Sequence, residues 1–127
     1  MTPFLNEEGM RWALRVFAEA PPGVERHLVL RNRQRVYGLL HAHHDEFRAL
    51  GVSLFDYWVP SPSGSGYETF HAKVVLADAE FAYLGSANFI RYLCSSVEMG
   101  VLLEGLPVLA VAETVAAAKE ISEKFSV

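Results

Sequence analysis

The sequence predicts one mixed α/β domain, in which a mostly parallel sheet with antiparallel additions is flanked by helices. Two observations support this prediction. In the first half of the chain, segments with apolar residues at helical spacing alternate with short apolar runs that are typical of buried strands. In the second half, several such runs follow one another and a helical segment ends the chain. The 127 residues are 51% hydrophobic and show no internal repeat or domain boundary, so 1–127 are expected to form one domain.

The first half is expected to hold two helices. Asn6 can cap the first helix, two glutamates suit its first turn, and Pro-Pro-Gly at 21–23 ends it. Its apolar face consists of Met10, Ala13, Leu14 and Phe17. The second helix is expected over 34–50 and ends at Gly51. Its apolar positions are Val36, Leu39, Leu40, Phe47 and Leu50.

Five apolar runs, most of them rich in β-branched or aromatic residues, are expected to form strands. They are 27–31, 52–59, 70–77, 80–86 and 96–105. The run PSPSGSG at 60–66 predicts a flexible loop, and Asp78 and Ala79 a tight hairpin turn. A last helix is expected around Pro107, because proline suits a first helical turn. Its apolar stripe is Val108, Val111, Val115, Ala118, Ile121 and Phe125.

The net charge is −4 and is unevenly spread along the chain. Residues 1–50 hold seven arginines against six acidic residues, whereas 51–127 hold four basic against nine acidic residues. This balance argues against broad electrostatic binding of nucleic acid. One local basic cluster is either a phosphate-facing patch or an ordinary solvated segment. It comprises Arg26, Arg31, Arg33 and Arg35.

The N-terminus lacks the basic region and the apolar run of a secretory signal. No apolar stretch reaches the roughly 20 residues needed to span a bilayer. The single cysteine, Cys94, excludes an internal disulfide and fits a reducing compartment. We therefore expect a cytoplasmic protein without a transmembrane segment.

The stretch HAKVVLADAEFAYLGSAN, residues 71–88, places polar or special residues at fixed offsets among apolar ones. They are His71, Lys73, Asp78, Gly85, Ser86 and Asn88. Residues i and i+2 of a strand share a face, about 6.6 Å apart, so His71 and Lys73 are expected side by side. The hairpin should return Ser86 and Asn88 to the same end. A nucleophile, a cation, a hydroxyl and an amide suit a phosphoryl group, and the set lacks the clustered carboxylates of a metal site.

Glu98 is a second anomaly, because it lies in the otherwise apolar run VEMGVLL. A buried carboxylate needs a partner. A histidine ring nitrogen is a natural one, since the carboxylate fixes the tautomer and orientation of the ring.

Together these residues resemble the HxKx4Dx6GSxN motif of the phospholipase D superfamily. At about 5% per residue, a chance match at six fixed positions is on the order of one in a million for a chain of this length. The run S-V-E-M-G-V at 96–101 also resembles the strand that supplies a supporting glutamate in that family. The C-terminal half looks most like the phospholipase D-like proteins of bacterial defence islands, including the DISARM anti-phage system, with their H-A-K and N-x-E-x-G-V wording.

The resemblance implies a metal-independent mechanism without a cofactor. His71 would attack phosphorus and form a covalent phosphohistidine, while Glu98 would orient its ring. Lys73 and Asn88 would bind the phosphate. The supporting residues would be Asp78, structural at the hairpin, Gly85 and Ser86. A second histidine, from another copy of the motif, would protonate the leaving group and later activate water.

This chain carries one copy of the motif, and the family supplies the second by internal duplication or homodimerisation. We therefore expect a homodimer, or a second phospholipase D-like half, with two motifs meeting across a twofold axis. A half-domain of this family usually begins with one more strand and helix than this chain displays. The chain is then a naturally short member or part of a longer protein. A missing strand would leave a sheet edge open to pairing.

Two features also have plainer interpretations. Alone, His71 and Lys73 would be a satisfied core histidine and a snorkelling lysine, but the family spacing favours a site. The run HAHHD at 41–45 suggests zinc, yet on one helix His43 lies on the apolar face and the other ligands point away. We therefore expect His43 to be a packing residue.

Two further features stay open. Tyr57 and Trp58 are either core residues or platforms that stack a base or an acyl chain near the site. The loop at 60–66 is either a mobile flap over the site or a plain surface loop.

The function expected first is a phosphodiesterase, most of all a nuclease or a nuclease-like defence component. The alternative within enzymes is a phospholipid hydrolase or transphosphatidylase, which needs a membrane-facing apolar surface that the sequence does not display. The alternative of another class is a non-catalytic fragment that binds nucleic acid or a partner protein. DNA, RNA and phospholipid share the same reaction chemistry, so the motif does not separate them.

Overall fold

The computed structural model describes residues 1–88 and 97–127. The helices are α1 (Glu7–Glu19), the 3-10 helix η1 (Arg33–Val36), α2 (Tyr37–Ala42), α3 (His44–Leu50) and α4 (Leu106–Glu120). The strands are β1 (Arg26–Leu30), β2 (Val52–Asp56), β3 (Val59–Pro60), β4 (Tyr67–Glu68), β5 (Lys73–Ala77), β6 (Phe81–Gly85), β7 (Gly100–Glu104) and β8 (Glu123–Phe125). In the part of the chain that the structure describes, no helix is long and apolar enough to cross a membrane.

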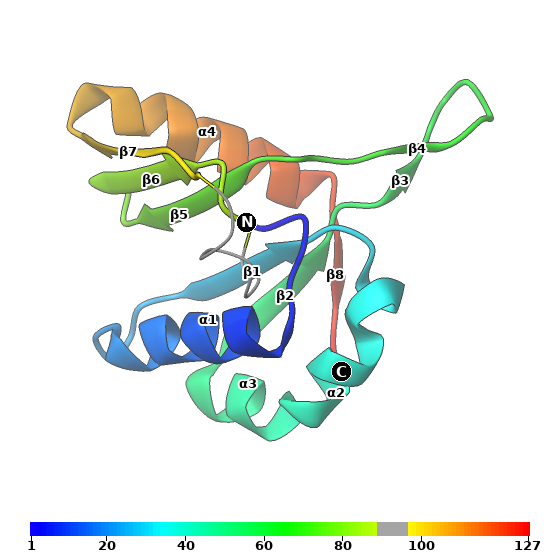
Figure 1. Cartoon of the computed structure of the whole chain (residues 1–127), viewed down its shortest axis with the longest axis horizontal. Helices are drawn as coiled ribbons and strands as arrows, with labels where there is room; N and C mark the ends of the chain where they lie inside the picture. Colours follow the sequence, from blue (N-terminus) through cyan, green and yellow to red (C-terminus); the bar gives the residue numbers. More distant parts are fainter. Residues whose placement is uncertain (89–96) are drawn as a thin grey trace.

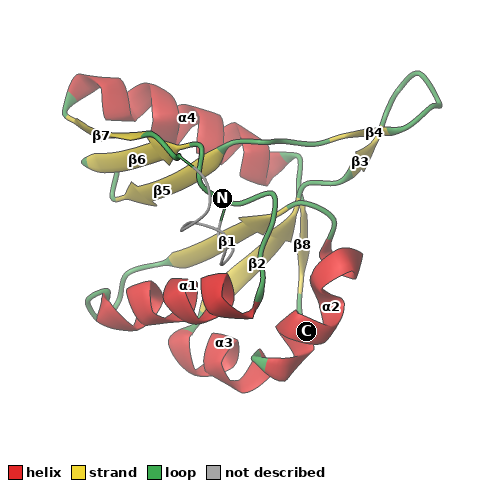
Figure 2. Ribbon diagram, viewed as in Figure 1, coloured by secondary structure: helices red, strands yellow, loops and turns green. Residues whose placement is uncertain are grey.

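Two three-stranded ladders form the body of the molecule (Figure 1). In the first, β1 pairs in parallel with β2, and β8 pairs antiparallel with the other edge of β2. In the second, β5, β6 and β7 are all antiparallel. A third pair, β3 with β4, forms an arm that projects from the body (Figure 2). The mixed α/β fold is confirmed, but among the described strand pairs parallel pairing is less frequent than expected.

Helices cover both ladders. The three helices α1, α2 and α3 lie against one face of β1 and β2 and build the main core there. Its buried members are Leu5, Met10, Leu14, Leu28, Leu30, Leu40, Phe47 and Leu54. A smaller cluster of Val29, Phe55 and Phe70 lies apart from this core. Helix α4 packs on β6 and β7 and buries Val108 and Ala118. The first helix is confirmed in detail, with Asn6 accepting a hydrogen bond from the Gly9 amide at 3.0 Å.

The N-terminal segment joins the two ladders. The Thr2 amide donates to the Val29 carbonyl at 3.1 Å, and Thr2 pairs in parallel with Leu30. On the other side, the Met1 amine donates to the Val74 carbonyl at 2.7 Å, and the Val74 amide donates back to Met1 at 3.0 Å. This exchange of two bonds is the pattern of an antiparallel pair. The strand order across the molecule is therefore β8, β2, β1, the N-terminal segment, β5, β6 and β7.

Beyond Met1 the facing edges of β1 and β5 separate, and a cleft of about 880 Å³ lies between them. Val29 and Val75 line it from the two strands, Phe17 from α1 and Val115 from α4. Among the described strand pairs, β1 pairs only with β2 and β5 only with β6, so neither strand has a strand partner along this cleft. The gap lies in line with Met1. An extended segment running into Met1 would lie parallel to β1 and antiparallel to β5.

The single helix expected over 34–50 is wrong. The segment is a 3-10 helix followed by α2 and α3, which are separated at His43 with φ −111° and ψ 18°. His43 is buried, and its two ring nitrogens lie 3.1 Å from a Glu46 carboxylate oxygen and 3.2 Å from the Glu7 carboxylate oxygens. These polar contacts reach α1 and α3 from the break. The expected closure of α3 by Gly51 is confirmed at φ +64°.

The last helix is shorter than its apolar stripe suggests. It ends at Glu120, and Phe125 belongs to β8, which the sequence analysis misses. Strand β8 has three residues, too few for a periodic signal, and it forms because β2 offers an open edge. Arg33 anchors it through an ion pair of 2.9 Å with Glu123. Ile121, expected on the buried stripe, is 53% exposed.

The first prediction concerns the cleft between β1 and β5. Four apolar β-branched residues fused before Met1 should pair with both edges and raise the free energy of unfolding by about 2 kcal/mol, because each side chain would be buried. The fusion also removes a buried amine, whose pKa burial lowers to about 5. The melting temperature should rise by several degrees, as calorimetry will show. The same extension with two prolines should give no gain, and an equal gain from it would contradict strand pairing.

The second prediction concerns His43. Burial alone would lower its pKa, but the carboxylates of Glu46 and Glu7 outweigh burial and raise the pKa above 6.5. Stability from this raised pKa is complete below about pH 6.5 and is lost as the pH rises through the folded-state value. The stability difference between the wild type and His43→Gln should therefore shrink between pH 6 and pH 9. Urea titrations at each pH will measure it, and a constant difference would contradict the assignment.

Candidate active site

The hairpin of β5 and β6 carries the centre of the predicted site. Lys73 is the first residue of β5 and pairs with Gly85 at the end of β6. His71 lies two residues before the strand and is exposed, whereas the sequence analysis places it within the strand. Lys73 is 5% exposed, so its cation is held largely out of water. The expected neighbourhood of His71 and Lys73 is found despite the shifted strand boundary.

The Lys73 ammonium group lies against the His71 ring. Its Nζ is 2.9 Å from His71 Nδ1, 3.4 Å from Nε2, and donates to the His71 carbonyl at 2.9 Å. Burial lowers the pKa of Lys73, and the negative charge of Glu98 partly opposes this. A desolvated cation beside an exposed imidazole is an arrangement that attracts an anionic group.

Ser86 and Glu98 meet at the same end of the hairpin. The Ser86 hydroxyl donates a hydrogen bond to the Glu98 carboxylate and accepts one from the Met99 amide at 3.0 Å. The Ser86 amide donates to the Met99 carbonyl at 2.9 Å. Ser86 therefore ties the residues before β7 to the end of β6. Ser86 is thus one partner of Glu98, and the expected pairing of Glu98 with His71 stays a prediction.

Gly85 has a packing reason that the motif does not reveal. It pairs with Gly100 on β7, and the ring of Tyr83 lies over both glycines. A Cβ atom at Gly85 would lie 2.7 Å from Tyr83 Cζ, and one at Gly100 would lie 2.5 Å from the same atom. Real Cβ atoms do not approach carbon so closely, so the glycine pair makes room for the ring. The close approach expected at Gly85 is thus to a side chain of its own strand.

Asn88 and Asp78 lie at opposite ends of β6. The Oδ1 atom of Asn88 is buried and has no hydrogen-bond partner among the described residues. An unpaired buried amide oxygen costs free energy, so this position calls for a donor. Asp78 and Ala79 have φ of +51° and +56°, and the Glu80 amide donates to the Ala77 carbonyl at 2.9 Å. This is a type I′ turn, the expected tight hairpin, and Asp78 lies in it.

Residues outside the motif also surround His71. The Phe4 ring lies edge-on to the His71 ring with centroids 5.9 Å apart, and the Arg31 guanidinium carbon lies 5.6 Å from the Phe4 centroid. Phe4 has no local signal in the sequence, because only the pairing of Met1 and Thr2 between the ladders brings it next to His71. Arg31, in contrast, is one of the four clustered arginines that the sequence marks as possible phosphate contacts.

That cluster divides in the structure. Arg26 donates to four backbone carbonyls at and beyond the end of α1, at distances from 2.8 to 3.1 Å. Arg33 pairs with Glu123. Arg35 is exposed on η1, and of the four only Arg31 is placed beside the His71 surroundings by a described contact. The interpretation of the cluster as one phosphate-facing patch is therefore wrong.

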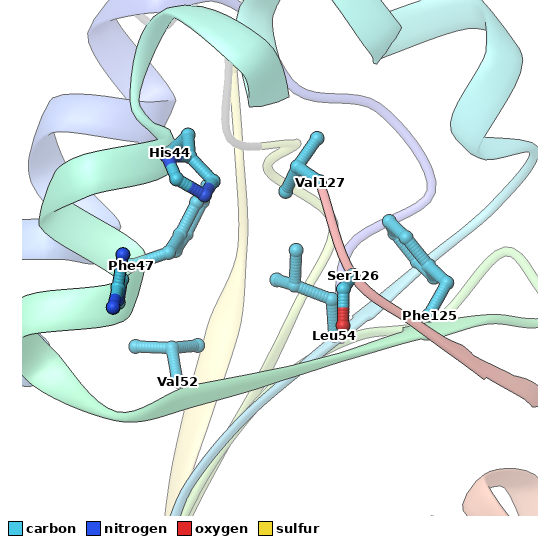
Figure 3. A pocket seen from close by; sticks show the side chains of 8 residues that line it. His44, Phe47, Val52, Leu54, Phe125, Ser126 and Val127 are labelled. Carbon is cyan, nitrogen blue, oxygen red and sulfur yellow. The ribbon is translucent and has the colours of Figure 1, made fainter.

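The histidines at 41–45 do not gather into one group. His44 lies near Asp45, at 3.2 Å, and His43 is held by Glu7 and Glu46. Within residues 1–88 and 97–127, no group of three or more candidate ligands could hold a metal ion. A separate cavity of about 250 Å³ lies between α3, β2 and the C-terminal residues (Figure 3). Apolar residues such as Phe47 and Leu54 and polar ones such as His44 and Arg48 line it together, and none of the predicted site residues does.

Comparison with known proteins identifies the fold. No protein-family model matches the sequence, and no curated protein matches it. Among solved structures, NucT from Helicobacter pylori matches with a TM-score of 0.70 and 16% sequence identity, over 98% of this chain and 79% of that one. At this identity the likeness shows the fold alone. The chain has the phospholipase D-like α/β half-domain fold that its sequence predicts.

Proposed function

We propose that this protein is a nuclease-like phosphodiesterase in which His71 is the nucleophile. The observation that carries the proposal is the buried Lys73 ammonium group, 2.9 Å from Nδ1 of the exposed His71 ring. The HxKx4Dx6GSxN spacing and the phospholipase D-like fold support it. A role in anti-phage defence of the DISARM type is proposed from the short motifs at 71–73 and 96–101 alone. A cytoplasmic location rests on the single cysteine.

The contacts suggest how a phosphodiester would be engaged. Lys73 now donates to His71 Nδ1, and an arriving phosphate would draw the ammonium group onto its own oxygens. Nδ1 is then able to hold the ring proton while Nε2 attacks. The side-chain amide nitrogen of Asn88 would be a further phosphate ligand, because Asn88 follows β6 at the same end of the hairpin. Ser86 would keep Glu98 in place as the supporting carboxylate.

The reaction would proceed in two displacements. The His71 lone pair attacks phosphorus, an N–P bond forms, and the P–O bond to the leaving group breaks. A histidine from the second motif gives its proton to the leaving oxygen. The same histidine then removes a proton from water, and the resulting hydroxide displaces His71 from phosphorus. Both histidines return to their first states.

The second motif is proposed to come from a second copy of this chain. Among the described strands, β7 lies at a sheet edge, and exposed apolar residues surround it. They are Val97, Met99, Val101, Leu102 and Leu106, with exposed fractions from 54% to 96%. Apolar surface on a sheet edge marks an interaction site. Because Glu98 lies within this surface and contacts Ser86, a partner bound here would lie next to the site.

The third prediction tests the nucleophile. The wild type should hydrolyse bis(p-nitrophenyl) phosphate in the presence of EDTA, because the mechanism needs no metal. His71→Ala should lower kcat by about three orders of magnitude or more, and Lys73→Met by about 100-fold, because a nucleophile and a charge-stabilising group are lost. His41→Ala is the matched control, an exposed histidine on α2, and should keep full activity. Activity that survives His71→Ala would refute the mechanism.

The fourth prediction tests the dimer. Sedimentation should show a dimer for the wild type and a monomer for the double variant Leu102→Lys, Leu106→Lys, because charge would replace apolar surface at 66% and 82% exposed positions. Phosphodiesterase activity should fall with the dimer fraction. Ile121→Lys, 53% exposed at the other end of α4, is the control and should remain dimeric. A fully active wild-type monomer would contradict the shared site.

A further inference from the structure

A continuous row of rings and one guanidinium group extends away from His71. Phe4 lies edge-on to His71. Arg31 lies over both Phe4 and Trp58, with its guanidinium carbon 5.6 Å and 5.7 Å from the two ring centroids. Trp58 then stacks on Tyr67, with centroids 4.6 Å apart and planes at 17°. We call Phe4, Arg31, Trp58 and Tyr67 the aromatic-arginine row.

Topology brings these four residues to one edge of the molecule. Arg31 directly follows β1, and Trp58 comes two residues after β2, so both lie beyond the carboxyl ends of the parallel pair. His71 precedes β5, which runs antiparallel to the N-terminal segment and therefore starts at the same edge. Tyr67 lies on β4, in the projecting arm (Figure 1). The row thus connects His71 with the arm.

Arg31 is available for an anionic ligand. The guanidinium group of Arg26 donates hydrogen bonds to backbone carbonyls, and Arg33 forms an ion pair with Glu123. For Arg31 the structure gives no hydrogen bond and no ion pair within the described residues, only its two ring contacts. A guanidinium group between two rings keeps its N–H donors in its own plane, directed past the rings. That geometry suits a phosphate held at the side of the stack.

The rings of the row differ from those of the core. Tyr57, next to Trp58, stacks on the buried Phe70 and belongs to the small core cluster. In contrast, Phe4 is 38% exposed and Tyr67 is 55% exposed. The alternatives left open for Tyr57 and Trp58 therefore separate: Tyr57 packs in the core, and Trp58 belongs to a surface stack. Exposed rings of this kind stack bases of any sequence.

We propose that the aromatic-arginine row binds single-stranded nucleic acid next to the phosphodiester at His71. Arg31 holds a neighbouring phosphate, and the exposed ring of Tyr67, backed by Trp58, stacks an unpaired base. Duplex bases present only their edges, so a ring can take a base only from an unpaired strand. The inference rests on the proposed function for the position of the scissile phosphate, and it adds a substrate class to that function.

The fifth prediction is a binding experiment in the His71→Ala variant, which prevents cleavage. Fluorescence anisotropy will compare a labelled 20-nucleotide oligothymidylate with a 20-base-pair duplex. The single strand should bind more tightly. Tyr67→Ala should weaken single-strand binding about 5- to 100-fold, the range for one stacked base. Arg31→Gln should weaken it and lower the slope of log affinity against log salt by about 0.7, the share of one phosphate contact.

Two substitutions serve as matched controls. Tyr37 is 58% exposed, close to the 55% of Tyr67, but lies on α2. Arg35 is an exposed arginine of η1 outside the row. Tyr37→Ala and Arg35→Gln should bind the single strand like the parent variant. Equal loss in control and row variants would overturn the inference, because it would indicate an unspecific charge or stability effect.

The outcomes separate this inference from the proposed function. If the wild type fails to hydrolyse bis(p-nitrophenyl) phosphate while Tyr67→Ala still weakens single-strand binding, the enzyme proposal fails and the row stands. If hydrolysis occurs but Tyr67→Ala and Arg31→Gln bind like the parent, the row is wrong. Tighter binding of the duplex would also overturn it. So would binding that is confined to phosphatidylglycerol vesicles and sensitive to the same two substitutions.

Discussion

The backbone pairing of Met1 and Thr2 is the constraint on which the rest of this structure depends. Thr2 bonds to β1 and Met1 bonds to β5, so two residues connect a ladder built around a parallel pair with an antiparallel one. Without them the hairpin that carries Lys73 would have no backbone connection to β1 in the described structure. The connection occupies only one end of the gap, and along the cleft beyond it neither edge has a partner strand among the described residues. The stability of the connection between the two ladders should therefore depend on which residues are placed in the gap next to Met1.

The same pairing sets the chemistry of one edge. Because Thr2 lies beside the end of β1, Phe4 follows next to Arg31, and Thr2 donates its hydroxyl proton to the Phe4 carbonyl at 2.8 Å. Because Met1 lies antiparallel to β5, the start of that strand faces the same way. His71 therefore meets Phe4, although 67 positions separate them in the chain. In open α/β sheets this carboxyl edge is where ligands bind.

What the sequence predicted well was local. The hairpin from Lys73 to Gly85, the turn at Asp78 and the first helix follow from periodicity and turn chemistry over a few residues. Apart from shifted element boundaries such as the start of β5, the failures are non-local. The helix break at His43 accompanies carboxylate contacts that reach back to α1, β8 forms on the open edge of β2, and Phe4 needs both ladders to reach His71. A periodic pattern does not contain the partner that decides such positions.

Three features of the candidate site are left incomplete among the described residues. Among the described contacts, the Lys73 cation has only atoms of His71 within hydrogen-bonding distance, and burial lowers the pKa of Lys73. Asn88 keeps a buried oxygen without a described partner. The strand that follows Glu98 exposes apolar residues on an open edge. A bound anion would pair with the Lys73 cation, and a second chain would cover the exposed apolar residues of the strand that follows Glu98. Because Ser86 bonds both Glu98 and Met99, a partner chain on that edge would also hold the carboxylate, so in the proposed dimer one hydroxyl group would couple assembly to the site.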